Sequence, residues 1–522
     1  MSATTDIEPA SATGRKPVGT REKQLLVALT LLALALRVTS LSRSLFTDEA
    51  YSLALAQRGL WHMLELFGYE ANGTPYPIVL WPVIRIFGTS EAVLRMPAVL
   101  AGTASVPALW WAARRLAPPT AALLAAALLA LNPMAVFYSQ FARPYALVML
   151  AACLSFGALA RALEHERGGG RGAWVGYVLA MALLAYTDIL AAPIAIPAQG
   201  LMAWRAGRER FRMWLLSLLA LLACCIPLLI AAAIAHGRRD ALYWLPKPDR
   251  GLVTLAVQEF TAGFSDVSAV RWATLAAAAV LVGVALWTLR SARRSSEQRA
   301  ALAVAACWGI LPPVLLFLAS FAKPVFWPRY AIIALPGVCL LLAVAAVIVW
   351  QSRRGLAIGA GCMLAIAVAG LYADARQRTK LQENWPPAAA WLRAERSVSQ
   401  PIILDNVLAL PVLGYYDSAF RAPGGDVVVQ EWHDRPLPSG VVGFKDPGGY
   451  GGVPDGPPSA AEIAALARRG AGTVWLLGAG FDKDLQGDPR SGAAVDWARA
   501  HCHVEVREST GVWLMRASSC RG

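Results

Sequence analysis

The sequence predicts a polytopic α-helical membrane protein that carries an extracytoplasmic α/β domain at its C-terminal end. Three observations support this fold class. Hydrophobic residues make up 57% of the chain and charged residues only 16%, and the apolar residues gather in repeated runs of membrane-spanning length. Basic clusters lie between these runs, whereas acidic and aromatic residues gather in the alternate loops. From residue 374 onward the composition is mixed and contains no spanning run.

The apolar runs predict about eleven spans. They are expected near residues 24–42, 92–113, 119–133, 145–163, 173–187, 189–204, 213–235, 269–289, 300–321, 329–350 and 355–373. The polar segment 1–20 is expected to be a disordered, cytoplasmic N-terminus, because basic residues precede the first span. That span lacks a small-residue cleavage site, which favours an uncleaved helix over a signal peptide. An odd number of spans places the C-terminal domain outside the cytoplasm.

The net charge of +14 would suggest a nucleic-acid partner in a soluble protein. Here the positive clusters fall between apolar runs, as in cytoplasmic loops under the positive-inside bias. We therefore expect contact with anionic membrane lipids and none with nucleic acid.

The predicted membrane module covers residues 21–373 and has two long outer loops. The first, 43–91, contains the apolar segment 76–88, which is too short to span and is expected to lie at the interface. The second covers roughly 236–268.

Residues 374–522 are predicted to form the soluble domain, because buried strands alternate with helices. Strands are expected at 401–404, 473–477, 504–506 and 512–514, and helices at 459–469 and 493–500. No glycine-rich phosphate fingerprint follows these strands, so no nucleotide site is assigned. Cys502 and Cys520 lie on or beside the last two strands. They are expected to form a disulfide outside the cytoplasm, with two free thiols as the alternative.

Asp48 and Glu49 give the strongest functional signal. These adjacent carboxylates directly follow the first span, where an ionisable group is costly unless it is used or paired. A carboxylate at that position can act as a general base on an acceptor hydroxyl or amine. The alternative is that both acids cap a short helix over 49–58, since acids favour helix N-termini.

Cations are predicted on the same outer face. Arg143, two residues before Tyr145, begins a span and presents a fork suited to a carboxylate or phosphate. Lys323 and Arg329 oppose the positive-inside bias, which a bound phosphate would explain. The alternatives are a snorkelling arginine and an aromatic belt with scattered charges. Asp188, in another outer loop, is a weaker candidate.

Four motifs in chain order resemble the bacterial GT-C membrane glycosyltransferases, close to protein O-mannosyltransferases and to the lipid A aminoarabinose transferase. They are FTDEAY (46–51), FGTSEAVLRMP (87–97), YSQFARPY (138–145) and RYAIIALPG (329–337). The resemblance covers residues 24–350 in motifs and 374–522 only in architecture.

This resemblance implies a bacterial inner-membrane enzyme that moves a sugar from a polyprenyl-phosphate donor to a lipid, glycan or protein acceptor. It places the catalytic base at Asp48, with Glu49 beside it, and the donor phosphate at Arg329 and Lys323. Arg143 would orient the acids or the substrate, and Tyr145 and Asp188 are the other substrate-orienting candidates. Many relatives carry a histidine after a tyrosine where this chain has Tyr186-Thr187-Asp188, so the sugar and the acceptor stay open.

The chemistry expected of these residues is inversion by direct displacement, with no cofactor required. No cysteine or histidine pattern indicates a metal site, although a divalent cation is left open. A lipid or polysaccharide transporter or flippase is the alternative function, and a scaffold that binds an envelope partner is a third. Transport acids usually lie near the bilayer midplane, which favours the transferase.

Overall fold

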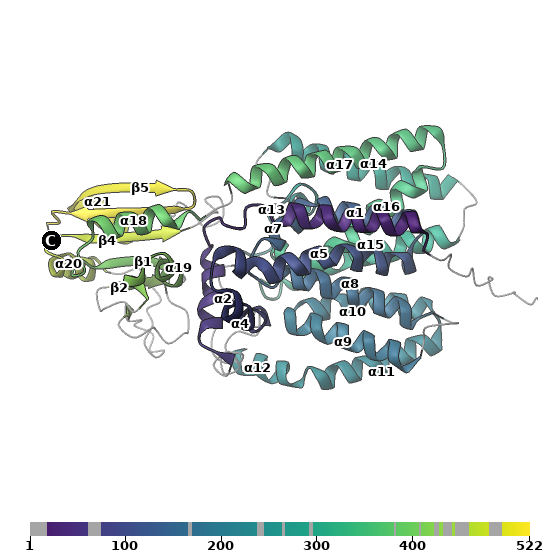
Figure 1. Ribbon diagram of the computed structural model, residues 1–522, viewed down its shortest axis with the longest axis horizontal. Coiled ribbons are helices and arrows are strands. Elements are labelled where there is room, and N and C mark those ends of the chain that lie inside the picture. Colours follow the sequence, from purple (N-terminus) through teal and green to yellow (C-terminus); the bar gives the residue numbers. More distant parts are fainter. Residues whose placement is uncertain are drawn as a thin grey trace, which may run out of the picture.

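The computed structural model describes residues 18–60, 75–164, 170–236, 245–263, 267–291, 296–380, 383–406, 409–421, 427–431, 441–443, 459–479 and 493–521. The molecule is elongated, with a helical bundle at one end and a smaller domain built on a sheet at the other (Figure 1). Residues 1–17, most of the segment predicted to be disordered, lie outside the described residues, as do 61–74 of the first outer loop.

All the regular secondary structure in the described part of the membrane module is helical. In chain order they are α1 (Thr20–Arg37), α2 (Thr47–Gln57), α4 (Pro75–Phe87), α5 (Glu91–Leu116), α6 (Pro119–Leu131), α7 (Pro133–Ser139), α8 (Tyr145–Ala162), α9 (Arg171–Thr187), α10 (Ala191–Arg205), α11 (Arg208–Cys224), α12 (Ile226–His236), α13 (Arg250–Ala262), α14 (Ser268–Ser291), α15 (Ser296–Ala319), the 3-10 helix η1 (Pro328–Ala334), α16 (Leu335–Val349) and α17 (Arg353–Lys380).

The described helices are consistent with a polytopic membrane protein. Six of them are long and apolar enough to cross a bilayer, or up to eight if each of two bent pairs is one span. Helices α1, α9 and α10 lie in the same bundle (Figure 1) but are too short or too charged to be counted among these. The helical membrane fold is confirmed, and the figure of about eleven spans stays a prediction.

Two predicted features of the bundle differ in detail. The pair α6 and α7 bends by 58° and the pair α11 and α12 by 56°. Pro133 and Pro227 begin the second halves of these pairs, and each lacks the N–H that would continue the helix.

In addition, α13 lies inside the segment predicted as the loop 236–268. Its start is stabilised by Asp249, which accepts a hydrogen bond from the N–H of Leu252 at 2.8 Å.

The second domain, which we call the outer domain after its predicted location, contains a six-stranded sheet in the order β3-β2-β1-β4-β6-β5. Its strands and helices are α18 (Trp385–Glu395), β1 (Ile402–Asn406), α19 (Ala409–Tyr416), the 3-10 helix η2 (Ser418–Phe420), β2 (Val427–Glu431), β3 (Val441–Gly443), α20 (Ala460–Arg469), β4 (Val474–Ala479), α21 (Ala493–His501), β5 (His503–Ser509) and β6 (Val512–Ser518). Strands β1 to β4 are parallel, and β6 runs antiparallel to both β4 and β5. The predicted strands are present, whereas β2 and β3 were not predicted.

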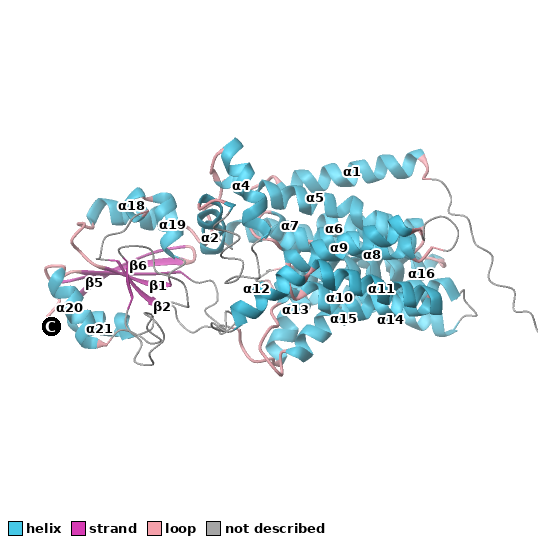
Figure 2. Ribbon diagram, turned by 90° about the horizontal axis from the view of Figure 1, so that it is seen from below, coloured by secondary structure: helices cyan, strands magenta, loops and turns pink. Residues whose placement is uncertain are grey.

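The sheet is covered on both faces, as Figure 2 shows with α18 and α19 on one side and α20 and α21 on the other. Successive residues of a strand point to opposite faces. Thus Trp475 and Leu477 pack with α18 and α19, while Val474 and Leu476 pack with α20 and α21. The core on the α18–α19 face continues into α2, α4 and α5 of the membrane module. The outer domain therefore rests directly on the first outer loop.

Candidate active site

Glu49, in the first outer loop, forms an ion pair with Arg95, and both side chains are fully buried. Arg95 lies in α5 and donates to Oε1 of Glu49 at 2.8 Å and to Oε2 at 2.6 Å. The remaining bonds of Arg95 go to the main-chain oxygens of Leu41, Arg43 and Ser44, at 2.7 to 3.0 Å. These five bonds use all five N–H donors of the guanidinium. We call Glu49, Arg95 and the three carbonyls the anchor.

The carboxylate of Glu49 likewise uses all of its hydrogen-bonding positions. Besides Arg95 it accepts hydrogen bonds from the N–H of Phe46 at 3.0 Å and of Ala142 at 2.7 Å. Four bonds fill its four acceptor positions. Burial alone would raise the pKa of Glu49, but the charge of Arg95 outweighs burial and lowers it. All acceptor positions of Glu49 are thus used within the anchor, and its predicted place beside Asp48 in catalysis stays a prediction.

The anchor is supported by further buried contacts from the loop after α7. Arg43 donates to the carbonyl of Gln140 at 3.0 Å and lies over the ring of Phe137 at 5.3 Å. The ring of Phe46 meets Phe141 edge-on with 5.0 Å between centroids. These contacts fix the segment that precedes Asp48 against the segment that precedes Arg143.

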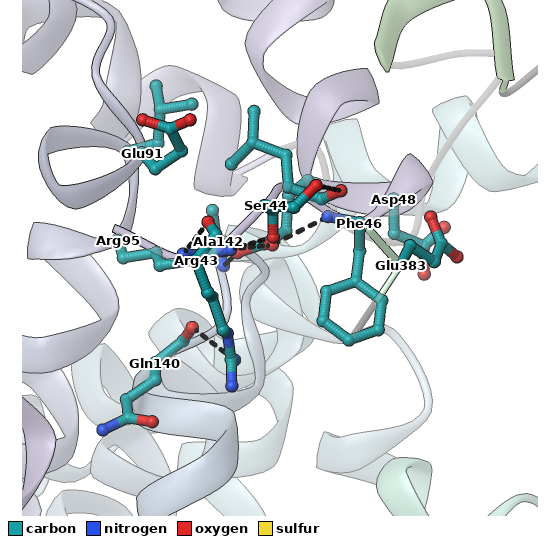
Figure 3. A network of polar contacts seen from close by, with 12 residues as sticks. Arg43, Ser44, Phe46, Asp48, Glu91, Arg95, Gln140, Ala142 and Glu383 are labelled. Carbon is teal, nitrogen blue, oxygen red and sulfur yellow. Dashed lines mark hydrogen bonds and ion pairs between the residues drawn. The ribbon is translucent and has the colours of Figure 1, made fainter. Parts of the chain in front are cut away.

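Asp48 lies in the first turn of α2 and faces the opposite way. Figure 3 shows its carboxylate away from Arg95, on the side of the network where Glu383 lies. Its side chain is half-buried, and in the part of the chain that the structure describes it forms no hydrogen bond and no ion pair within 4 Å. Asp48 nevertheless interacts through space with Arg143 and Arg329. We call these three side chains the open cluster.

The two arginines of the open cluster come from different parts of the chain. Arg143 precedes α8, and its buried Nε has no hydrogen-bond partner among the described residues. Burial would lower the pKa of Arg143, but Asp48 and Tyr145 oppose this and the net effect is to raise it. Arg329 begins η1 and lies over the rings of Tyr145 at 5.8 Å and Tyr330 at 5.5 Å. The structure thus brings Asp48, Arg143, Tyr145 and Arg329 together.

The predicted roles of the other site residues stay predictions. Lys323 is half-buried in the link between α15 and η1. Asp188 is buried and accepts a hydrogen bond from the N–H of Leu190 at 2.9 Å, next to the start of α10. The through-space interactions that join Asp48 to its two arginines involve neither of them. Cys502 and Cys520 form a disulfide beside β5 and β6.

Three acidic or basic residues near the site were not singled out from the sequence. Arg95 sits inside an apolar run, and a buried charge needs a partner, so its position was a usable signal. Glu383 accepts from the N–H of Thr47 at 2.7 Å. Glu259, buried on α13, acts on Tyr138. No sequence pattern links these last two acids to the first outer loop. Among the described residues no cluster of three metal-ligating side chains is present.

Residues 75–231 match the family described as dolichyl-phosphate-mannose-protein mannosyltransferase. The matched segment includes Arg95 of the anchor and Arg143 of the open cluster. A search of curated proteins found no match.

Solved structures match over nearly the whole chain. ArnT from Cupriavidus metallidurans in the apo state has a TM-score of 0.57 at 14% identity, covering 96% of this chain and 99% of that one. ArnT bound to undecaprenyl phosphate gives 0.56 at 16% identity, with 95% and 98% covered. The oligosaccharyltransferase AglB from Archaeoglobus fulgidus, with an inhibitory peptide and a dolichol-phosphate, gives 0.53 at 14% identity, with 95% and 74% covered. The chain therefore has the fold of the GT-C membrane glycosyltransferases, and the resemblance predicted from its motifs is confirmed.

Proposed function

We propose that the protein transfers a sugar from a polyprenyl-phosphate donor to an envelope acceptor at the extracytoplasmic face of the bacterial inner membrane. The observation that carries this proposal is the open cluster. A half-buried carboxylate, Asp48, interacts electrostatically with two arginines and yet forms no ion pair with either among the described residues. A carboxylate near two cations and not paired with them is the combination that a general base and a phosphate-binding pair require.

The roles follow from the charges. An acceptor hydroxyl attacks the anomeric carbon while Asp48 takes the hydroxyl proton. The bond from that carbon to the phosphate oxygen breaks, and the bonding electron pair leaves with the phosphate. Arg143 and Arg329 stabilise the charge that develops there. Attack from the side opposite to the leaving phosphate inverts the anomeric centre.

The comparisons support the class of donor. Solved structures with this fold were obtained with undecaprenyl phosphate and with a dolichol-phosphate, the latter together with a peptide. Both lipids carry a phosphate on a long prenyl chain, which matches two arginines at the end of an apolar bundle. The nature of the sugar and of the acceptor is left out of the proposal.

The test uses the full-length protein in liposomes with a panel of radiolabelled undecaprenyl-phosphate sugars and a membrane extract as the source of acceptor. We expect label to leave the donor and appear in the extract, with release of undecaprenyl phosphate. Movement of intact donor across the bilayer without release of undecaprenyl phosphate would instead identify a transporter and overturn the proposal.

A further inference from the structure

The start of α2 is held by a side chain from the segment that enters the outer domain. Glu383 is 5% exposed. Its Oε2 accepts hydrogen bonds from the N–H of Thr47 at 2.7 Å and from the indole N–H of Trp385 at 2.8 Å. Its Oε1 accepts from the hydroxyl of Thr47 at 3.2 Å. The carboxylate therefore reaches across more than 330 residues of sequence to the residue next to Asp48.

Helix α2 needs these bonds because its own cap residue supplies none. The first N–H groups of a helix have no partner within it and are usually capped by a preceding polar side chain. Phe46 occupies that position and has no side-chain acceptor. Glu49 reaches back to the N–H of Phe46, and Glu383 takes the N–H of Thr47. The first turn, which carries Asp48, is thus capped by one carboxylate from within α2 and one from the outer domain.

Other contacts join the outer domain to the same loop. The N–H of Trp385 donates to the hydroxyl of Ser44 at 3.2 Å. The hydroxyl of Tyr416 accepts from the N–H of Leu45 at 2.8 Å and lies 3.2 Å from Oε1 of Glu91. Loop and outer domain therefore share one hydrogen-bonded boundary, and Glu383 contacts that loop at the residue next to Asp48 in sequence.

We propose that Glu383 is a positioning residue for Asp48, so that the outer domain completes the active site by capping the helix that carries the base. This inference rests on the proposed function of Asp48. It assigns the outer domain a role in the chemical step, whereas acceptor choice alone would leave that step independent of Glu383.

The charge of Glu383 offers a readout that a simple packing contact would lack. Burial raises its pKa to about 7, with a further contribution from Asp48 that the donors Trp385 and Thr47 partly offset. Asp48 is the charged neighbour that acts on Glu383, while Thr47 and Trp385 are neutral. Charge-assisted hydrogen bonds are about twice as strong as neutral ones, so ionisation of Glu383 should tighten its hold on α2.

The experiment compares Glu383→Ala with Glu383→Gln in the full-length protein. The alanine variant loses every bond to Thr47, and we expect kcat to fall by about 10- to 100-fold with little change in the donor KM, because Arg143 and Arg329 are untouched. The glutamine variant keeps the length of the side chain and one acceptor oxygen for Thr47, so E383Q should keep kcat within about threefold of wild type at pH 8. The matched control is Glu462→Ala, which removes the capping glutamate of α20 inside the outer domain and should leave kcat unchanged.

The pH profile tests the inference even if Glu383→Ala fails to fold. Wild-type kcat should rise between about pH 6 and 8 as Glu383 ionises, and E383Q should lack this rise. An E383Q profile that superimposes on the wild type, or an alanine variant with wild-type kcat, would overturn the inference. If instead Asp48→Asn keeps full activity, the proposed role of Asp48 as the base fails; if no variant and no wild-type protein releases undecaprenyl phosphate from the donor, the proposed function fails, and these failures are distinguishable from that of Glu383.

Discussion

The anchor and the open cluster each contain one of two neighbouring carboxylates, Glu49 and Asp48. They differ in how completely their charged groups are bonded. In the anchor, every acceptor position of Glu49 and every donor of Arg95 is used. In the open cluster, the side chain of Asp48 has no hydrogen-bonded or ion-paired partner among the described residues, although it acts on Arg143 and Arg329. Asp48 and Glu49 point in different directions from one helical turn, so a fully bonded ion pair lies next to the proposed base.

The comparison teaches that a buried charge is stable only when its partners are complete. Arg95 lowers the pKa of Glu49 despite complete burial. Asp188 and Glu383 are buried without a bonded cation in the described structure, and burial raises their pKa values to about 6 and about 7. The anchor should therefore govern stability, and the open cluster should govern turnover.

The largest expected effect is on turnover. Asp48→Asn keeps the shape of the side chain but removes the base, and we expect transfer to fall by about a thousandfold or more. Because the side chain of Asp48 forms no hydrogen bond or ion pair in the described structure, the melting temperature should stay close to wild type. Transfer assays and thermal unfolding of the same preparation provide the check. Full transfer by this variant would remove Asp48 from the mechanism.

The second effect is on stability. Glu49→Gln leaves Arg95 buried without its counter-charge, and we expect a loss of about 3 to 5 kcal/mol in the free energy of unfolding. Replacing both partners, as Glu49→Leu with Arg95→Met, removes the buried charge but leaves two main-chain N–H groups and three carbonyls without these partners, so it should cost at least as much as Glu49→Gln alone. Unfolding midpoints in detergent would show this order, and a double variant more stable than the single one would contradict it.

The third effect depends on pH. The folded-state pKa of Asp188 is about 6 against an ordinary value of 3.8, so the folded protein binds this proton more tightly than the unfolded chain. The associated stability is present below about pH 4 and is lost as pH rises through 6, by up to about 3 kcal/mol. Asp188→Asn should remove this loss and keep the bond to Leu190. The difference between the two proteins in unfolding midpoint, followed from pH 4 to 8, is the measurement; parallel curves would argue against it.

The smallest effect concerns the donor. Arg329→Ala removes one cation from the open cluster and should raise the apparent donor KM by about tenfold, which corresponds to about 1.4 kcal/mol. Lys323→Ala is the matched comparison, since Lys323 is not among the groups that act most strongly on Arg329, and it should change the donor KM by less than about threefold. Equal effects of the two substitutions would return Lys323 to the phosphate site predicted from the sequence.

Much of this arrangement could be predicted from the chain itself, for identifiable reasons. Hydropathy locates the helices of the bundle because lipid requires long apolar runs. Asp48, Arg143 and Arg329 could be identified because charges at the outer ends of such runs need an explanation. The bends at Pro133 and Pro227 were missed because each apolar run was counted as one straight span, and the helix α13 was missed because a local cap, Asp249, decides its start. The separation of Glu49 from Asp48 was also missed, because adjacent residues on a helix face different partners and Arg95 lies 46 positions away.

Glu383 could not be found by the same means. It lies in a polar stretch after the last membrane helix, and its partner Thr47 is contributed by the opposite end of the chain. Only the packing of the outer domain on the first loop brings them together. The strands β2 and β3 were missed for a related reason, because each is short and is stabilised mainly by pairing with its neighbours.

Arg95 holds the first outer loop through hydrogen bonds to main-chain oxygens, and these contacts determine which positions tolerate substitution. Every residue has a main-chain carbonyl. Because Leu41 accepts the hydrogen bond from Arg95 with its carbonyl, other amino acids at this position can make the same bond. Arg95 itself has no such freedom, since no other side chain offers five donors. In a saturation-mutagenesis library, we therefore expect many substitutions to be tolerated at position 41 and almost none at position 95.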